Sequence, residues 1–435
     1  HRVGGWGAPL GIDLLADGLS ALMLLMTAAV GLGVTVHAFA YFEDHGPPGQ
    51  DAGGRIRRLL FWPLWLFLWA ALVALFLTRD VFNVYVTLEL VGLSSVALVA
   101  LAGETAALGA AARYLVLALT GSLAYLLGVG LLYAAHGTLD ADGLRAALAP
   151  GLVASAAGAL VTGGLAVKAA LFPLHGWLPP AHAGAPSPVS AALSALVVKA
   201  SFYLLVRWYG EVLPPGLTEG AAHALGVLGA LAILWGSVQA LRQPRLKQVI
   251  AYSTVAQLGY LFLFFPLARE LGAGPALAGA ALFAVAHALA KAALFLAAGA
   301  VLHALPGDRM EHLRGLGARM PLTTATIVLA SASLLAIPPT GGFAGKWFLL
   351  SAAVTTGRWW WAVVMLAGGL LAAGYVFRVL QLAISPAEDE APARAPLAME
   401  LSAFSLAAAA VLVGLVPWAP LGLLAAAAPL AGGAP

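Results

Sequence analysis

The chain has 435 residues, of which 62% are hydrophobic and only 9% are charged, and its mean hydropathy is +0.93. Soluble proteins have about 45–50% apolar and about 25% charged residues, so this composition excludes a soluble enzyme, a disordered chain and a nucleic-acid-binding protein. The formal charge of +3 is a thin excess over few charges and indicates no anionic partner, and the lack of cysteine excludes disulfide scaffolds and thiolate metal sites. The composition predicts an all-α polytopic membrane protein.

Twelve apolar stretches are long enough to cross a bilayer, which takes about 20 residues. In chain order they cover 16–42, 59–78, 81–102, 110–135, 152–173, 185–210, 221–241, 247–267, 276–303, 321–357, 359–384 and 397–418. The segments between them are too short to fold alone, so residues 1–435 are expected to form a single membrane domain that ends in a C-terminal helix and tail at 397–435. A solvated loop is expected at 386–396. Because the chain starts at His1 rather than Met, helices that precede it are expected to be missing.

Two of these spans are interrupted. Ile337-Pro338-Pro339-Thr340-Gly341-Gly342 divides the tenth span, and Pro173 followed by Pro179-Pro180 disturbs the end of the fifth. Reading the tenth span as two separate helices would leave the second with only about 15 residues, so a broken helix is favoured. Irregular backbone at membrane depth is tolerated where it is buried in protein or lines a water-filled cavity, and paired broken helices point to a transport site between two related halves.

Loop arginines and lysines predict the orientation in the membrane. Three loops rich in these residues fall on one face, which is therefore expected to be cytoplasmic, with both termini outside. They contain Arg55, Arg57 and Arg58; Arg242, Arg245 and Lys247; and Arg309, Arg314 and Arg319.

Ionisable residues inside the spans are the strongest functional signal. Glu89, Lys168, Lys199, Lys291 and Lys346 lie within or beside apolar stretches. A charge at the centre of a membrane helix costs roughly 2.5–3.5 kcal/mol, so these residues must pair, meet water or lose their charge. The alternative interpretation is that they are snorkelling anchors or packing ion pairs. Lysine can lose its proton when desolvated, whereas arginine cannot.

Histidines supply further candidates for proton relay, since an unperturbed imidazole titrates near pH 6.5. His287 lies four residues before Lys291 and therefore on the same helix face. His175 follows Lys168 by seven residues and would share its face if the helix continued through Pro173. The histidine spacing does not favour a metal site, and no cofactor-binding motif is present, so neither a metal nor a cofactor is predicted.

The segment 168–207 reads KAALFPLHGWLPPAHAGAPSPVSAALSALVVKASFYLLVR. It resembles the most distinctive segment of the proton-translocating antiporter-like subunits of respiratory complex I, membrane hydrogenases and Mrp-type cation/proton antiporters. Further segments agree with that family in order and spacing, at 11–31, 82–95, 245–260, 287–305 and 337–347. Within the family, the opening segment and the lysine of Phe343-Ala344-Gly345-Lys346 look closest to the Mrp-type D subunit.

The resemblance implies a fold of fourteen helices with two inverted five-helix repeats, each holding a broken helix. The twelve spans would then be helices three to fourteen, with the half-channel repeats at about 59–210 and 221–384. It also implies a proton path. In that path Glu89 pairs with Lys168, Lys199 connects the halves, Lys291 and His287 form the central relay, and Lys346 is the terminal group.

The expected function is that of a proton-translocating subunit of a multisubunit sodium/proton antiporter, in the inner (plasma) membrane with other membrane subunits. The chain is expected to be an ion-transport subunit rather than an enzyme. Three alternatives remain open at this point. They are a proton-pumping subunit of a redox complex (an NADH:quinone oxidoreductase or a membrane hydrogenase), a structural subunit that has lost transport, and a related subunit of a carbon-uptake complex.

Overall fold

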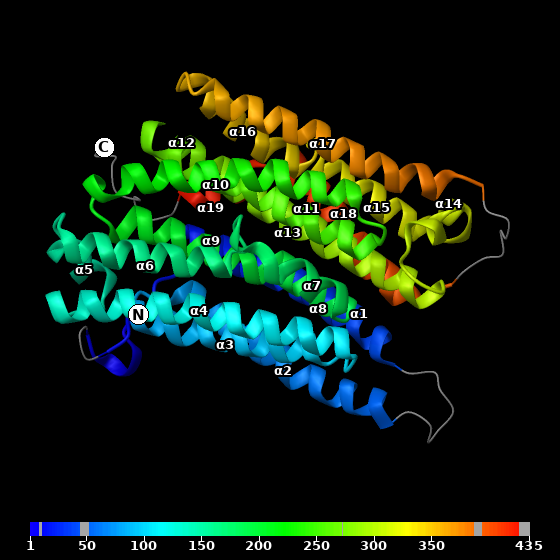
Figure 1. The fold of residues 1–435 in the computed structure, drawn as a ribbon, viewed down its shortest axis with the longest axis horizontal. Helices are drawn as coiled ribbons and strands as arrows, with labels where there is room; N and C mark the ends of the chain where they lie inside the picture. Colours follow the sequence, from blue (N-terminus) through cyan, green and yellow to red (C-terminus); the bar gives the residue numbers. More distant parts are fainter. Residues whose placement is uncertain (8–10, 44–51, 272, 387–393, 426–435) are drawn as a thin grey trace.

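The computed structural model describes residues 1–7, 11–43, 52–271, 273–386 and 394–425. Its elements are helices that run side by side along one direction and form one bundle (Figure 1). In the described residues, ten helices or helix runs are long and apolar enough to cross a membrane, and two shorter apolar helices belong to interrupted spans. These account for the twelve predicted spans and confirm the all-α polytopic membrane fold. Most of the loop predicted at 386–396 lies outside the described residues.

The first part of the chain contains four long helices, with a short turn before them and a short helix after them. Its elements are η1 (Val3–Gly5), α1 (Gly18–Phe42), α2 (Ala52–Leu77), α3 (Val81–Ala100), α4 (Thr105–His136) and α5 (Ala141–Ala147). Aspartates cap α1, α3 and α5, because the side chains of Asp17, Asp80 and Asp140 accept backbone N–H groups of the first turns at 2.7–2.9 Å. These caps lie at one end of the bundle, here named the α5 end (Figure 1). The opposite end, which holds α14 (Leu316–Arg319), is named the α14 end.

The first broken helix consists of α6 (Leu152–Lys168), a short turn η2 (Leu174–Trp177) and α7 (Leu178–Gly184). The predicted span of 152–173 is too long, since α6 ends at Lys168, before Pro173. Ala170 adopts a left-handed conformation with φ of 52°. Its N–H and that of the next residue donate to carbonyls three and five residues back, which closes the helix in a Schellman motif.

The second broken helix repeats this geometry. After η5 (Met310–Leu313) and α14, α15 (Pro321–Leu334) ends before a left-handed Ala336 with φ of 59°, and α16 (Gly341–Thr355) follows. The N–H groups of Ala336 and Ile337 again donate to carbonyls three and five residues back. The interruption predicted in the tenth span is therefore present, and the two breaks have the same hydrogen-bond pattern.

The remaining helices build the centre and the far side of the bundle. They are α8 (Ser187–Ala192), the π-turn η3 (Leu193–Val197), α9 (Val198–Arg207), η4 (Trp208–Val212), α10 (Pro215–Arg242), α11 (Leu246–Phe262), α12 (Phe264–Leu271), α13 (Ala273–Ala304), α17 (Trp359–Ile384), α18 (Leu397–Leu415) and α19 (Trp418–Ala425). The α8–α9 run and α13 are enclosed by protein along their whole apolar window, and α11 is nearly so, whereas α17 and α18 are about one-third buried. The three enclosed spans form the core, and the others separate them from lipid.

Two helix pairs approach each other through glycines. A Cβ on Gly164 of α6 would lie 2.3 Å from the carbonyl oxygen of Gly121 on α4, and a Cβ on Gly259 of α11 would lie 2.3 Å from that of Gly229 on α10. Small residues allow such backbone contact between membrane helices. Each broken or central helix is thereby held tightly against one outer helix.

Candidate functional site

The lysines predicted to carry function are all inside the bundle. Lys199 and Lys291 have no exposed surface, and Lys168 and Lys346 are only 8% exposed. They come from α9, α13, α6 and α16, that is, from two of the core spans and from both broken helices.

Lys168 is the last residue of α6, at the first helix break. Its Nζ lies 3.9 Å from the carboxylate of Glu89 on α3 and 3.3 Å from the carbonyl oxygen of Leu88, to which it donates a hydrogen bond. The ammonium also lies at the helix C-terminus, where the backbone dipole favours a cation. A small cavity of about 10 Å³ adjoins it. The structure thus brings the predicted pair of Glu89 and Lys168 together.

Lys199 is the second residue of α9, which directly follows the π-turn η3. Its Nζ donates to the carbonyl oxygen of Ser194, which lies inside that turn. A π-turn replaces the ordinary i→i+4 hydrogen bonds, and π-turns occur frequently at functional sites. In the described structure no carboxylate forms an ion pair with Lys199.

A polar bridge on α11 connects Lys199 to Lys291. The hydroxyl of Ser194 lies 2.9 Å from that of Thr254, and Thr254 donates to the carbonyl oxygen of Ile250 at 3.0 Å. Lys291 donates to the same Ile250 oxygen at 3.1 Å and also to the hydroxyl of Ser253. The two central lysines are therefore linked through hydroxyl and carbonyl groups of a third helix.

A stripe of α13 leads from Lys291 to Lys346. The ring of His287, one turn before Lys291, stacks on Phe283 at 5.7 Å between centroids. Lys346 lies over the rings of Tyr260 and Phe283 at 4.1 and 5.3 Å, and donates to the carbonyl oxygen of Leu334 at 2.8 Å. That carbonyl belongs to the last residue of α15, where helix carbonyls have no partner within the helix. Lys346 therefore provides a hydrogen-bond donor for a carbonyl group at the second helix break.

The histidines divide into two groups. His287 and His182 are fully enclosed, and neither ring has a protein hydrogen-bond partner among the described residues. His182 stacks at 4.5 Å on Phe295, one turn beyond Lys291. His175 instead lies in η2 and stacks on Phe172 at 5.6 Å. Because α6 ends at Lys168, the seven-residue spacing does not place His175 on the face of that lysine.

Lys247, which its position in the sequence groups with one of the three arginine- and lysine-rich loops, lies at the start of α11 but is buried. It is 4% exposed, and its Nζ donates at 2.5 Å to the carbonyl oxygen of Ala185, just after α7. Its backbone N–H lies 3.3 Å from a carboxylate oxygen of Asp308. Because Lys247 lies close to Arg242 and Arg245 in the sequence, it was grouped with these loop residues and its burial was not predicted.

Sequence reasoning also missed Ser194, Thr254 and His182. Hydroxyl residues are frequent in membrane helices, and nothing in the sequence separates a hydroxyl that bonds to its own helix from one that joins two helices. For Thr254, the one available signal in the sequence was the adjacent hydroxyl pair Ser253-Thr254 inside the predicted span 247–267.

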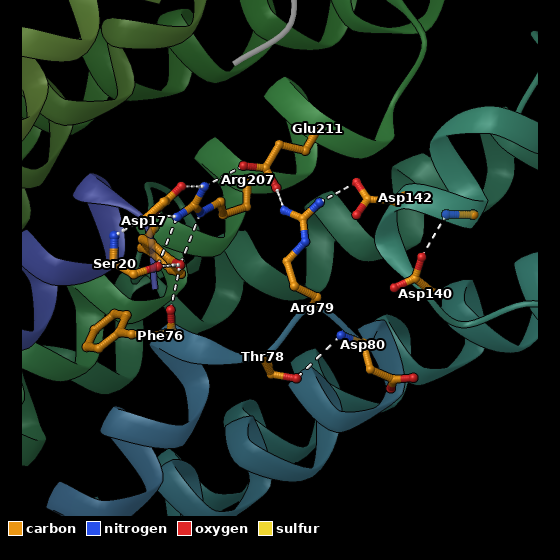
Figure 2. A network of polar contacts seen from close by, with 12 residues as sticks. Asp17, Ser20, Phe76, Thr78, Arg79, Asp80, Asp140, Asp142, Arg207 and Glu211 are labelled. Carbon is orange, nitrogen blue, oxygen red and sulfur yellow. Dashed lines mark hydrogen bonds and ion pairs between the residues drawn. The ribbon is translucent and has the colours of Figure 1, made fainter. Parts of the chain in front are cut away.

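A second charged cluster lies at the α5 end (Figure 2). The guanidinium of Arg207 contacts the carboxylates of Asp17 and Glu211, and Arg79 lies between Glu211 and Asp142, with 2.5 Å to the latter. We name these five residues the ion chain. Burial raises the pKa of the Asp17 carboxyl, but the hydrogen bonds and charge of Arg207 outweigh it and hold that pKa below its usual value.

The ion chain joins segments far apart in sequence. It ties together the start of α1, the α2–α3 turn, α5 and the end of α9. Its exposure increases along its length, because the Asp17 side chain is 4% exposed and that of Asp142 is 72% exposed. Tyr203 extends it inward, since its hydroxyl accepts from Arg207 Nε at 3.0 Å and donates to the carbonyl oxygen of Phe76 at 2.8 Å.

Comparisons with known proteins agree with this architecture. Residues 78–372 match the family described as NADH:quinone oxidoreductase/Mrp antiporter, transmembrane. The chain is 36% identical over 399 residues to the N subunit of the NADH-quinone oxidoreductase of Desulforudis audaxviator, covering 91% of this chain and 77% of that protein. It is 30% identical over 354 residues to the D subunit of the Na(+)/H(+) antiporter of Alkalihalophilus pseudofirmus, covering 80% and 68%. A chain in the structure of the Mrp complex from Dietzia sp. DQ12-45-1b superposes with a TM-score of 0.86 at 26% identity, covering 97% of this chain and 85% of that one.

Proposed function

Because the chain belongs to the NADH:quinone oxidoreductase/Mrp antiporter membrane family, we propose that it carries protons along its row of buried lysines. We place it in a multisubunit antiporter that exchanges protons for a monovalent cation such as sodium, alongside other membrane subunits. Its site on this proposal consists of Glu89, Lys168, Lys199, Lys291, His287 and Lys346. His175 stays a predicted relay at the first break.

One observation carries the proposal. Four lysines are buried at membrane depth, and in the described structure only Lys168 has a carboxylate within ion-pair distance. A permanent charge in that position is costly, and lysine, unlike arginine, is able to release its proton there. Fixed packing ion pairs would require a carboxylate for each ammonium.

The proposed mechanism follows from charge coupling between neighbours. While Glu89 stays near Lys168, the pair favours the charged amine; when Glu89 withdraws, Lys168 releases its proton toward Lys199. The bridge through Ser194 and Thr254 then couples Lys199 to Lys291, and the α13 stripe couples Lys291 to Lys346. The charge on each site therefore shifts the protonation equilibrium of the next site.

The division into two half-channels at about 59–210 and 221–384 is part of the proposal. The shared geometry of the breaks at Ala170 and Ala336 supports it. So do the corresponding glycine contacts of α4 with α6 and of α10 with α11.

The pair at the first break provides the direct test. Lys168→Ala and Glu89→Gln are each expected to lower proton flux in membrane vesicles by about 10²-fold or more, the range for loss of a proton-transfer group. Flux is read with a pH-sensitive dye after an imposed sodium or voltage gradient, and assembly is checked by co-purification. Glu104→Gln, an exposed carboxylate at the start of α4, is the control. Normal flux in assembled Lys168→Ala vesicles would refute the proposal.

The bridge between the central lysines gives a subtler prediction. Thr254→Val keeps the side-chain shape but removes the hydroxyl that joins Ser194 to Ile250, so proton flux is expected to fall by about tenfold or more. Thr326→Val is the matched control, because Thr326 is equally buried but bonds only to its own helix, at Leu322. Equal flux in the two variants would show that the Thr254 hydroxyl takes no part in proton transfer.

A second candidate function is proton pumping within a redox complex. It is favoured by the higher identity to the NADH-quinone oxidoreductase subunit than to the antiporter subunit, 36% against 30%. Purification of the complex through a tag on this chain separates the two. Co-purifying chains with flavin or iron–sulfur groups would support the redox complex, and a set made only of membrane subunits would support the antiporter.

A further inference from the structure

The outer face of α4 carries a charge without a partner among the described residues. Arg113 is the ninth residue of α4 and is exposed, and its guanidinium forms no ion pair or hydrogen bond with the part of the chain that the structure describes. The predicted spans contain two other arginines, and both have partners. Arg207 belongs to the ion chain. Arg378 donates to the carbonyl oxygens of Leu241 and Gln243 at 2.6 and 2.9 Å.

Arg113 lies close to the depth of the first helix break. The next residue, Tyr114, lines the cavity beside Lys168 and stacks on Trp177 of η2 at 4.1 Å between ring centroids. The middle of α3, at 88–92, lines the same cavity. The 20 residues of α3 span about 30 Å, which is the thickness of the hydrocarbon core. The Cα of Arg113 therefore lies well inside that core, about 12 Å from the start of α4.

Lipid alone is a poor environment for this residue. Arginine keeps its proton in proteins, and a charge deep in a membrane span is costly unless it is paired. The side chain is able to snorkel, but it is shorter than the distance of about 12 Å to the start of α4, so the guanidinium approaches the lipid headgroups without lying among them. A carboxylate at the same depth, supplied from outside the described chain, would remove this cost.

The surface around Arg113 can accept a second helix. Gly109, Ala112, Val116 and Thr120 lie on the same side of α4 and are exposed. Together with Arg113 they are named the α4 face. A Cβ on Gly109 would meet no other atom within 4 Å, and Thr120 donates to the carbonyl oxygen of Val116 in its own helix. Small residues let membrane helices approach closely, so a partner helix packed here brings its side chains within reach of the guanidinium.

We propose that the α4 face binds a transmembrane helix of another subunit, and that this helix presents an aspartate or glutamate to Arg113. A guanidinium donates two parallel N–H groups to a carboxylate, which adds geometric specificity to the charge attraction. Each of the two charges thereby gains the partner that it needs inside the membrane. The inference rests on the proposed function only for the presence of other membrane subunits, and it does not depend on the buried lysines.

A photo-crosslinking residue tests the contact without changing the arginine. The amino acid p-benzoylphenylalanine is incorporated at Val116, which is 64% exposed and lies one turn from Arg113 on the α4 face. The intact complex is illuminated in its membrane, and the attached peptide is identified by mass spectrometry. The expected product joins α4 to a transmembrane segment of one other subunit that has an aspartate or glutamate within one turn of the crosslink. Attachment only to lipid, to a second copy of this chain or to a segment without a carboxylate would overturn the proposal.

Substitution of Arg113 tests the charge itself. Arg113→Leu presents a side chain that is fully compatible with lipid, so a merely snorkelling arginine could be replaced without loss of a subunit. If the arginine pairs with a carboxylate, its removal leaves that carboxylate unpaired, and recovery of the partner subunit after detergent washing is expected to fall by about tenfold or more. Arg145→Leu, at an exposed arginine of α5, is the matched control and should retain the partner. Equal recovery in Arg113→Leu and the parent would overturn the proposal.

A charge exchange completes the experiment. Arg113→Glu should also release the partner, and replacing the partner's crosslinked carboxylate with arginine should restore its recovery, which a general loss of folding would not allow. Both readouts measure association rather than transport. Normal proton flux in Lys168→Ala vesicles together with the expected crosslink would therefore reject the proposed function and keep this interface. Loss of flux together with attachment only to lipid would do the reverse.

Discussion

Lys291→Arg is expected to stop proton transport as completely as Lys291→Met, by about 10²-fold or more. Arginine retains the positive charge but does not release its proton within a protein, whereas methionine retains the length without any charge. If Lys291 acts by changing its protonation state, both substitutions remove the same step. If it were a fixed structural cation, arginine would preserve function by donating to Ile250 and Ser253, as Lys291 does.

The measurement is proton flux in vesicles that contain equal amounts of assembled complex. Leu296→Met, a volume-conserving change at a fully buried position of the same helix, controls for altered packing of α13. Near-normal flux in Lys291→Arg together with loss in Lys291→Met would show that a permanent charge suffices. That outcome would exclude Lys291 from proton relay.

Arg207→Ala is expected to produce the largest loss of stability among single substitutions at the α5 end. The Arg207 side chain is 12% exposed, and its removal leaves the Asp17 carboxylate buried without its guanidinium partner, while Glu211 retains its ion pair with Arg79. Breaking a buried ion pair from one side costs about 3–5 kcal/mol. A clear decrease in the thermal unfolding midpoint of the purified complex is therefore expected. Glu311→Gln, which removes an exposed pair with Arg309, should change stability by less than about 1 kcal/mol.

The pH dependence of the same variant provides an independent check. Because the pKa of Asp17 is lowered in the folded protein, its contribution to stability is present above the unfolded value of about 3.9 and is lost as the pH falls through the folded pKa. The difference in unfolding midpoint between the parent and Arg207→Ala should thus be constant near neutral pH and shrink in acid. A difference that is already absent at neutral pH would contradict a stabilising ion chain.

Helix spans and their interruptions were predictable because each depends on local sequence. Apolar runs of sufficient length give the twelve spans, and prolines follow both breaks, Pro173 after α6 and Pro338-Pro339 after α15. The end of α6 was less predictable, since the helix stops at Lys168 through the left-handed Ala170 before any proline is reached. Because α6 ends at Lys168, His175 does not share a helix face with that lysine, as it would if the helix continued through Pro173.

Contacts between distant segments were beyond sequence reasoning. Arg207 and Asp17 are 190 positions apart, and Ser194 and Thr254 are 60 apart. Their pairing depends on how helices rotate and pack, which a single sequence does not encode locally. The lysines themselves could be found, because an ionisable residue in an apolar span is unusual whatever its partners.

The apolar window of α13 is fully enclosed by protein, and this has a consequence for how the protein is made. This helix is packed by α1, α8 and α11, which precede it in the chain, and by α15, α16 and α18, which follow it. During synthesis it must therefore enter the bilayer before half of its surroundings exist, while Lys291 still faces lipid or the insertion machinery. A lysine at a helix centre then costs roughly 2.5–3.5 kcal/mol, which the alanine- and leucine-rich remainder of the span has to offset by itself. The high hydropathy of a helix that never touches lipid in the finished protein is thus a requirement of its biogenesis.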